Sequence, residues 1–186
     1  MCAKIPGKDS HNQSQVKIVL RPLGNIAGET MEDLRNGVGN VFQCPVEIEG
    51  GLDDLSQAYN SERKQHLSSA LLAALGKAGK NERVVGVADV DLYDPRLNFV
   101  FGEADMTLGT AVVSLYRLRP EYYGSVVDEP LFWERATKEI VHELGHTFGL
   151  KHCPNARCVM HFSNSLADTD VKEAHFCSKC RPRIIV

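Results

Sequence analysis

Apolar and polar positions follow two different periods along the first two thirds of the chain. Short runs rich in β-branched and aromatic residues predict strands, at residues 16–20, 46–48, 84–87, 98–101 and 109–115. Apolar residues at helical spacing predict two helices between the early strands, at 30–42 and 61–78. The second helix should begin at Ser61 and end near Gly76. This order predicts an α/β lobe built on a mixed sheet.

A third helical pattern follows at about residues 131–148. Asp128 precedes Pro130, and a capping acid followed by a proline in the first turn is typical of a helix start. Gly149 stands where a left-handed turn is expected to end the helix. The preceding segment, 117–130, is predicted to be a loop because it is rich in proline and glycine.

Composition and charge narrow the functional class. The 186 residues fit one domain, and 43% hydrophobic and 24% charged residues are typical of a soluble globular protein. The formal net charge of −3 provides no broad positive field, which argues against nucleic acid as the main partner. No apolar run approaches the roughly 20 residues needed to cross a bilayer, and residues 1–15 lack the apolar core of a signal peptide. We therefore expect a cytoplasmic protein, with a monomer favoured, and a flexible leader at 1–15.

The end of the third predicted helix carries a histidine pattern that indicates a metal site. Residues i and i+4 share a helix face, so His142 and His146 can bind one ion from the same side. Gly149 can adopt a positive φ, which lets His152 approach that ion after the helix ends. Three protein ligands and an open position are the usual plan of a catalytic zinc, and Glu143 can serve as general base toward a water molecule there. The alternative is a surface helix with incidental histidines.

Four of the six cysteines lie near the C-terminal end, as two pairs: Cys153, Cys158, Cys177 and Cys180. Two thiol pairs separated by a short insert predict a structural zinc site with four thiolate ligands. Two disulfides or free buried thiols are the alternatives, and His175 could replace one thiolate. Cys2 and Cys44 are expected to be free thiols.

The histidine string at 142–152, followed by Met160, resembles the metzincin clan of zinc peptidases. With the four cysteines it resembles the archaemetzincin family specifically. This resemblance implies an α/β (α+β) fold with two lobes on either side of a cleft. Residues 16–149 would form an N-terminal lobe with a twisted mixed sheet, a backing helix and the active-site helix. Residues 150–186 would form a small C-terminal lobe with the third histidine ligand, the methionine turn and the four-cysteine zinc site.

The resemblance also implies two zinc ions per chain and a role for each motif residue. The catalytic zinc would be held by His142, His146 and His152, with Glu143 as general base. The structural zinc would be held by Cys153, Cys158, Cys177 and Cys180, and Met160 would lie beneath the catalytic metal. Some metzincins carry a tyrosine two positions after that methionine, where this chain has Phe162. The oxyanion would then be stabilised by zinc or by another donor, with His161, Tyr122 and Tyr123 as candidates.

The expected function is zinc-dependent hydrolysis of peptide bonds in a peptide or protein substrate, and the resemblance favours aminopeptidase activity on short peptides. The strand at 109–115 is the candidate edge that pairs with the peptide. Candidates for binding the free amine are Glu103, Asp105, Glu121 and Asp128. One alternative is a non-catalytic zinc module that binds protein or nucleic acid through Lys172, Lys179, Arg181 and Arg183. Another is a latent peptidase with a blocked cleft.

Overall fold

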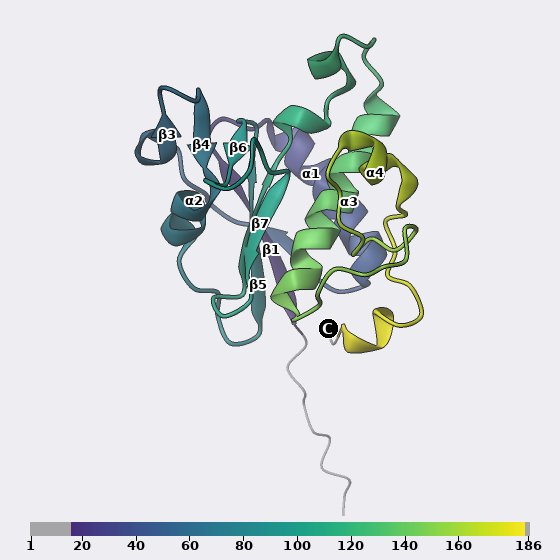
Figure 1. Ribbon diagram of the computed structural model, residues 1–186. Helices are drawn as coiled ribbons and strands as arrows, with labels where there is room; N and C mark the ends of the chain where they lie inside the picture. Colours follow the sequence, from purple (N-terminus) through teal and green to yellow (C-terminus); the bar gives the residue numbers. More distant parts are fainter. Residues whose placement is uncertain (1–15, 185–186) are drawn as a thin grey trace, which may run out of the picture.

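A five-stranded mixed sheet forms the centre of the computed structural model, which describes residues 16–184 (Figure 1). Its strand order is β2-β1-β5-β8-β7. The strands are β1 (Lys17–Leu23), β2 (Val46–Ile48), β5 (Glu82–Ala88), β7 (Gly102–Asp105) and β8 (Thr110–Ser114). All neighbours are parallel except β7, which lies at one edge antiparallel to β8. A smaller sheet consists of β3 (Tyr59–Asn60), β4 (Gln65–Leu67) and β6 (Leu92–Tyr93).

Helices cover both faces of the larger sheet. The α-helices are α1 (Gly28–Phe42), α2 (Ser68–Leu75), α3 (Glu129–Thr147) and α4 (Leu166–Val171). Short 3₁₀ helices are η1 (Ser56–Ala58), η2 (Tyr116–Leu118), η3 (Pro120–Tyr123) and η4 (Arg181–Arg183). In Figure 1, α2 lies on one side of the sheet and α1 and α3 on the other, while α4 and the C-terminal segment lie beyond α3. The longest helix, α3, is thus enclosed between the sheet and the C-terminal segment.

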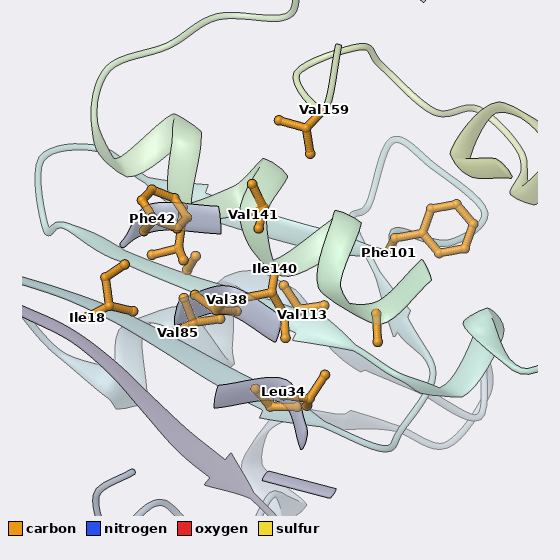
Figure 2. Packing of buried hydrophobic residues seen from close by; sticks show 14 of the residues in the cluster. Ile18, Leu34, Val38, Phe42, Val85, Phe101, Val113, Ile140, Val141 and Val159 are labelled. Carbon is orange, nitrogen blue, oxygen red and sulfur yellow. The ribbon is translucent and has the colours of Figure 1, made fainter. Parts of the chain in front are cut away.

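Side chains on the two faces of the sheet belong to two separate apolar clusters, because successive residues of a strand point to opposite faces. Along β1, Ile18 packs with residues of α1 and α3, whereas Val19 packs with residues of α2. Figure 2 shows the larger cluster, in which Val85 and Val113 of the sheet meet Ile140 of α3. The labelled residues also include Leu34, Val38, Phe42, Phe101, Val141 and Val159. Since Val159 belongs to the C-terminal segment, that segment shares this core.

The predicted helix at 61–78 is wrong over its first half. Only α2, Ser68–Leu75, is helical, and residues 65–67 form β4, which pairs with β6. Gln65 is buried, and its amide donates hydrogen bonds to Asp91 and to the backbone carbonyl of Asn98. These contacts with distant segments outweigh the local helical period. Gly76 does end the helix as expected, with a φ of 71°.

The predictions for 98–101 and 109–115 differ from the structure in where the strand lies and in which strand forms the edge of the sheet. The strand begins at Gly102, and Val100 forms only an isolated bridge with Leu92. β8 pairs with β5 on one side and β7 on the other, so its backbone groups are already used. The edge expected at 109–115 is therefore formed by β7 instead.

Most of the remaining local predictions agree with the structure. Strands β1, β2 and β5 and helix α1 lie where the patterns place them. Asp128 Oδ1 accepts a hydrogen bond from the Leu131 amide at 3.0 Å and caps α3, and Gly149 has a φ of 85°. The segment at 117–130 differs from the expected loop, because it contains most of η2, all of η3 and the first two residues of α3. No helix within residues 16–184 is long and apolar enough to cross a membrane. The expected leader at 1–15 and Cys2 lie outside the described residues.

Candidate metal centres and active-site cleft

Two histidines of α3 point their ring nitrogens at one another. His142 Nε2 and His146 Nε2 are 3.1 Å apart, because the four-residue spacing puts both rings on one face. The opposite nitrogens contact backbone carbonyls: His142 Nδ1 lies 2.7 Å from Val159 O, and His146 Nδ1 lies 2.8 Å from Leu150 O. A carbonyl only accepts hydrogen bonds, so each Nδ1 carries the proton and each Nε2 presents a lone pair.

His152 completes the group from outside the helix. The turn at Gly149, with its positive φ, reverses the chain after α3. The His152 ring then lies 5.3 Å from that of His142 and 4.8 Å from that of His146, measured between centroids. One ring nitrogen from each of the three histidines lies within 4.8 Å of the others.

The donor set of this histidine group fits a zinc ion. Burial lowers the pKa of His142 well below its ordinary value and lowers the pKa of His146 and His152 as well, so the rings are neutral. Nitrogen lone pairs that face each other at 3.1 Å repel, and a cation between them removes the repulsion. Neutral imidazoles with the second nitrogen bonded to a carbonyl are the form in which histidine binds zinc.

Glu143 lies buried beside this group, between α3 and the edge strand. Burial, and next the charge of Glu139, raise the pKa of Glu143 to about 8. The approach of β7 depends on Gly102, since a Cβ atom there would lie 2.6 Å from Glu143 Cγ. The sequence analysis missed Gly102, and its only signal was a glycine directly after a predicted strand.

Glu143 lines two neighbouring cavities. The glutamate-side cavity, of about 200 Å³, is lined by residues that include Phe99, Phe101, Glu139, Glu143, Phe162 and Ser163. The histidine-side cavity, of about 430 Å³, is lined by residues that include Glu103, Met106, Glu143, His146, His152 and Phe162. Residues of β7 and Phe162 of the C-terminal segment contribute to both, so the cleft lies between these two parts of the chain.

Met160, in the C-terminal segment, is fully buried. It packs against α3 at Gly145, where a Cβ atom would stand 2.3 Å from the methionine sulfur. The Met160 carbonyl also accepts a hydrogen bond of 2.8 Å from the Cys153 amide. Only a glycine on this turn of α3 allows so close an approach.

The four C-terminal cysteines form a second group of potential ligands. One sulfur from each of Cys153, Cys158, Cys177 and Cys180 lies within 4.8 Å of the others, and all four are free thiols rather than disulfides. Burial opposes ionisation of Cys177, but hydrogen bonds from the Cys180 and Lys179 amides and nearby thiols lower its pKa to about 6. A thiolate at neutral pH in a four-sulfur cluster fits a structural zinc site. His175 is exposed and is not part of this group.

The two groups share backbone. Cys158 is followed directly by Val159, whose carbonyl orients His142, and His152 is followed directly by Cys153. His161 Nδ1 lies 3.0 Å from the Cys153 carbonyl. An ion that fixes the four sulfurs would therefore also fix two of the three histidines.

Among the candidate acids, Glu103 alone lies in the cleft. It lines the histidine-side cavity, and the Ser68 hydroxyl of α2 donates a hydrogen bond to its carboxylate. Asp105 accepts hydrogen bonds from the amides of the turn that follows β7. Asp128 caps α3, and Glu121 is exposed on η3.

The other polar candidates have different surroundings. Tyr122 and Tyr123 are exposed on η3, pack against each other and line neither cavity. Phe162 lines both cavities, with its ring 4.8 Å from that of His152. Lys172 is not the surface cation expected of a binding module: it is buried, with Nζ 2.9 Å from Glu139 Oε1. The other three basic residues of that hypothesis are exposed: Lys179, Arg181 and Arg183.

The chain is similar to proteins of one family along most of its length. The model of peptidase family M54 matches residues 28–185. An archaemetzincin of Pyrococcus abyssi is 43% identical over 171 residues, covering 88% of this chain and 91% of that protein. An archaemetzincin of Methanocaldococcus jannaschii is 42% identical over 169 residues, covering 91% of this chain and 93% of that protein.

Solved structures agree with the sequence comparison. A crystal structure of archaemetzincin from Archaeoglobus fulgidus, complexed with malonate, superposes with a TM-score of 0.80 at 38% identity and covers 91% of this chain and 100% of that one. A zinc-dependent peptidase from Methanocorpusculum labreanum superposes with a TM-score of 0.81 at 30% identity, covering 89% and 98%. Fold and sequence therefore point to the same family.

Proposed function

Because this chain belongs to peptidase family M54, the archaemetzincins, and is a zinc metallopeptidase, we propose that Glu143 is its general base and that it removes N-terminal residues from short peptides. The observation that carries the proposal is the position of the Glu143 carboxylate, which borders both cavities beside the histidine group. A substrate that spans the two cavities would place its scissile bond at this carboxylate.

Each of the two zinc ions has its own ligand set in this proposal. His142, His146 and His152 hold the catalytic ion, and the four clustered cysteines hold the structural one. When bound, the catalytic ion polarises the scissile carbonyl and makes a water molecule more acidic. Residues 16–149 and 150–186 would form the two sides of the cleft, since β7 and Phe162 both line it.

Glu143 would transfer one proton in two stages. Its carboxylate accepts a proton from the attacking water and then donates it to the nitrogen of the departing amine. The buried position supports this role, because a carboxyl whose pKa is raised toward neutral can both accept and release a proton at physiological pH.

Glu103 would bind the free α-amine of the substrate. Glu103 lines the histidine-side cavity, and the Ser68 hydroxyl donates a hydrogen bond to its carboxylate. The strand that carries it, β7, is an edge, so its backbone can pair with an extended peptide. A negative charge in the binding site favours a peptide with a positively charged N-terminus.

The role of Glu143 is tested with Glu143→Gln, which keeps the shape and removes the base. We expect turnover by the zinc-loaded protein to fall at least about 100-fold, the scale of general-base catalysis, with both zinc ions retained. Glu121→Gln is the matched control, because it makes the same change on exposed η3. Undiminished turnover of the Glu143 variant would exclude the proposed base.

The aminopeptidase activity is tested with one short peptide in free and N-acetylated form. We expect only the free peptide to be cleaved at its first bond, and Glu103→Gln to raise KM for it. Asp105→Asn removes a charge from the same strand outside the two cavities. It should change neither the cleavage of the free peptide nor the KM for it. Equal cleavage of free and acetylated peptide would show an endopeptidase instead.

A further inference from the structure

A buried ion pair joins α3 to the segment that follows α4. Glu139 is 2% exposed and Lys172 is 1% exposed. Glu139 Oε1 lies 2.9 Å from Lys172 Nζ and accepts a hydrogen bond of 2.9 Å from Thr169 Oγ1. Burying two charges costs free energy that such a pair recovers only in part, so the pair is a weak source of stability. Its position suggests a use in the cleft instead.

Glu139 lies one helical turn before Glu143 and lines the glutamate-side cavity. Both contacts of its carboxylate go to Oε1, and no described residue donates a hydrogen bond to Oε2. A carboxylate has lone pairs for further donors on each oxygen. The cavity wall therefore contains a hydrogen-bond acceptor that is held in place through one oxygen and free at the other.

The rest of the glutamate-side cavity combines three phenylalanines with polar residues, among them Asn98, Ser163 and Asn164. Phe99 and Phe101 pack edge to face, with centroids 5.1 Å apart, and Phe162 belongs to the opposite side of the cleft. With its modest volume, the cavity has room for one side chain. Apolar walls with a small number of fixed polar groups are the usual composition of a specificity pocket.

The chemistry of Glu143 indicates which substrate residue enters this cavity, and this step rests on the proposed function. A general acid donates its proton to the nitrogen that leaves, so the residue bearing that nitrogen lies on the Glu143 side of the scissile bond. The glutamate-side cavity borders Glu143 and none of the three histidines. It is therefore placed to receive the side chain that follows the cleaved bond.

We propose that Glu139 determines substrate preference at this position. The pocket selects a side chain that is apolar along its length and carries a hydrogen-bond donor at its tip, as tyrosine does. The donor binds Glu139 Oε2, and the ring packs between the phenylalanines. An acidic side chain is rejected, because its carboxylate would meet the negatively charged carboxylate of Glu139 instead of donating a hydrogen bond to it.

The experiment compares two peptides that differ only by tyrosine or phenylalanine after the cleaved bond. For the zinc-loaded protein we expect kcat/KM to be about tenfold higher for the tyrosine peptide, since a hydrogen bond to a charged group has this order of effect. The double substitution Glu139→Met with Lys172→Met removes both buried charges at similar volume, a change that buried ion pairs often tolerate. It should cleave both peptides equally.

The control is Asp170→Asn, which weakens a different ion pair between α3 and α4. Asp170 contacts Arg135 at 2.6 Å and does not line the pocket, so the tyrosine preference should persist. Equal rates for the two peptides in the wild type, or an unchanged preference in the double variant, would overturn the proposal.

Binding of the same two peptides to zinc-loaded Glu143→Gln separates this inference from the proposed function. A lower Kd for the tyrosine peptide, lost when Glu139→Met and Lys172→Met are added, supports the pocket assignment even if no peptide is cleaved by the wild type. Absence of any cleavage then counts against the proposed function alone. Equal Kd values for the two peptides contradict the role of Glu139.

Discussion

Gly102 of β7 lies directly against Glu143 of α3. A Cβ atom at position 102 would stand 2.8 Å from Glu143 Oε1 and 2.8 Å from the backbone carbonyl of Val112. The carbonyl belongs to the backbone of the neighbouring strand, so both the glutamate and strand β7 itself would have to shift. The absence of one methyl group thus sets the distance between the edge strand and the proposed base.

Gly102→Ala should therefore displace Glu143 and strain the pairing of β7 with β8, so that both catalysis and stability decrease. We expect kcat/KM for a cleaved peptide to fall about 10- to 100-fold, because displacement of a catalytic group by a fraction of an ångström to one ångström has effects of this size. Both zinc ions should remain bound. Gly50→Ala is the control, since a Cβ atom there meets nothing within 4 Å. Unchanged kinetics would show that Glu143 has room to move.

Gly145→Ala should destabilise the protein. The new methyl group would lie 2.3 Å from the sulfur of Met160, which is fully buried and has no free space to enter. Overpacking typically costs about 1–3 kcal/mol, and alanine recovers roughly 1 kcal/mol over glycine in a helix. Urea denaturation should show a net loss of up to about 2 kcal/mol. Gly39→Ala within α1 meets only Val46, at 3.8 Å, and should instead be neutral or stabilising.

Cys158→Ser should release zinc from both sites. Cys158 precedes Val159, whose carbonyl orients His142, and its cluster partner Cys153 follows His152 directly. Loss of the structural ion would therefore loosen two ligands of the catalytic ion. Elemental analysis after dialysis should find fewer than one zinc per chain, whereas Cys44→Ser, outside the cluster, should keep two. Retention of one tightly held zinc in the Cys158 variant would refute the coupling.

The zinc-free protein should lose stability through Glu143 as the pH rises. Burial raises the pKa of this carboxyl from 4.5 to about 8 in the folded state. Between these values the folded state binds more protons than the unfolded state, so the free energy of unfolding decreases with rising pH. Glu143→Gln cannot titrate and lacks this contribution.

Urea denaturation of both chelated proteins between about pH 5 and pH 8 measures the effect. The stability of the wild type should fall relative to Glu143→Gln across this window, and the contributions of the histidines cancel in the difference. Parallel curves would show that the folded carboxyl titrates near its ordinary pKa.

Local sequence patterns predicted those parts of the protein whose geometry depends on few neighbouring residues. Helix α3, its cap at Asp128 and its end at Gly149 follow from spacing, because helix periodicity and backbone conformational limits act within a few positions. The same spacing places His142 and His146 on one face. The grouping of the four cysteines was likewise expected from their pairs, although their sulfurs are brought together by the fold.

Where a sequence pattern was compatible with two local structures, contacts with distant residues determined which one formed. Residues 65–67 continue a helical period, yet they form β4 because Gln65 finds partners near Asp91 and Asn98. The strand at 109–115 looked like an edge, and only pairing with β5 and β7 places it inside the sheet. Strand order depends on which remote segments pack together, which the period of one segment does not encode.

The sequence by itself determined the chemistry of this protein: which residues can bind zinc, which carboxylate lies beside them, and the helix that presents them. Only the tertiary structure decided the shape of the cleft. It placed Gly102 against Glu143, turned Lys172 inward onto Glu139, and aimed the carbonyl of Val159 at His142. The physical reason is how far apart in the sequence the interacting residues lie. Ligand type and helical spacing are properties of neighbouring residues, whereas close approach and burial arise where segments far apart in the chain share one packed interior.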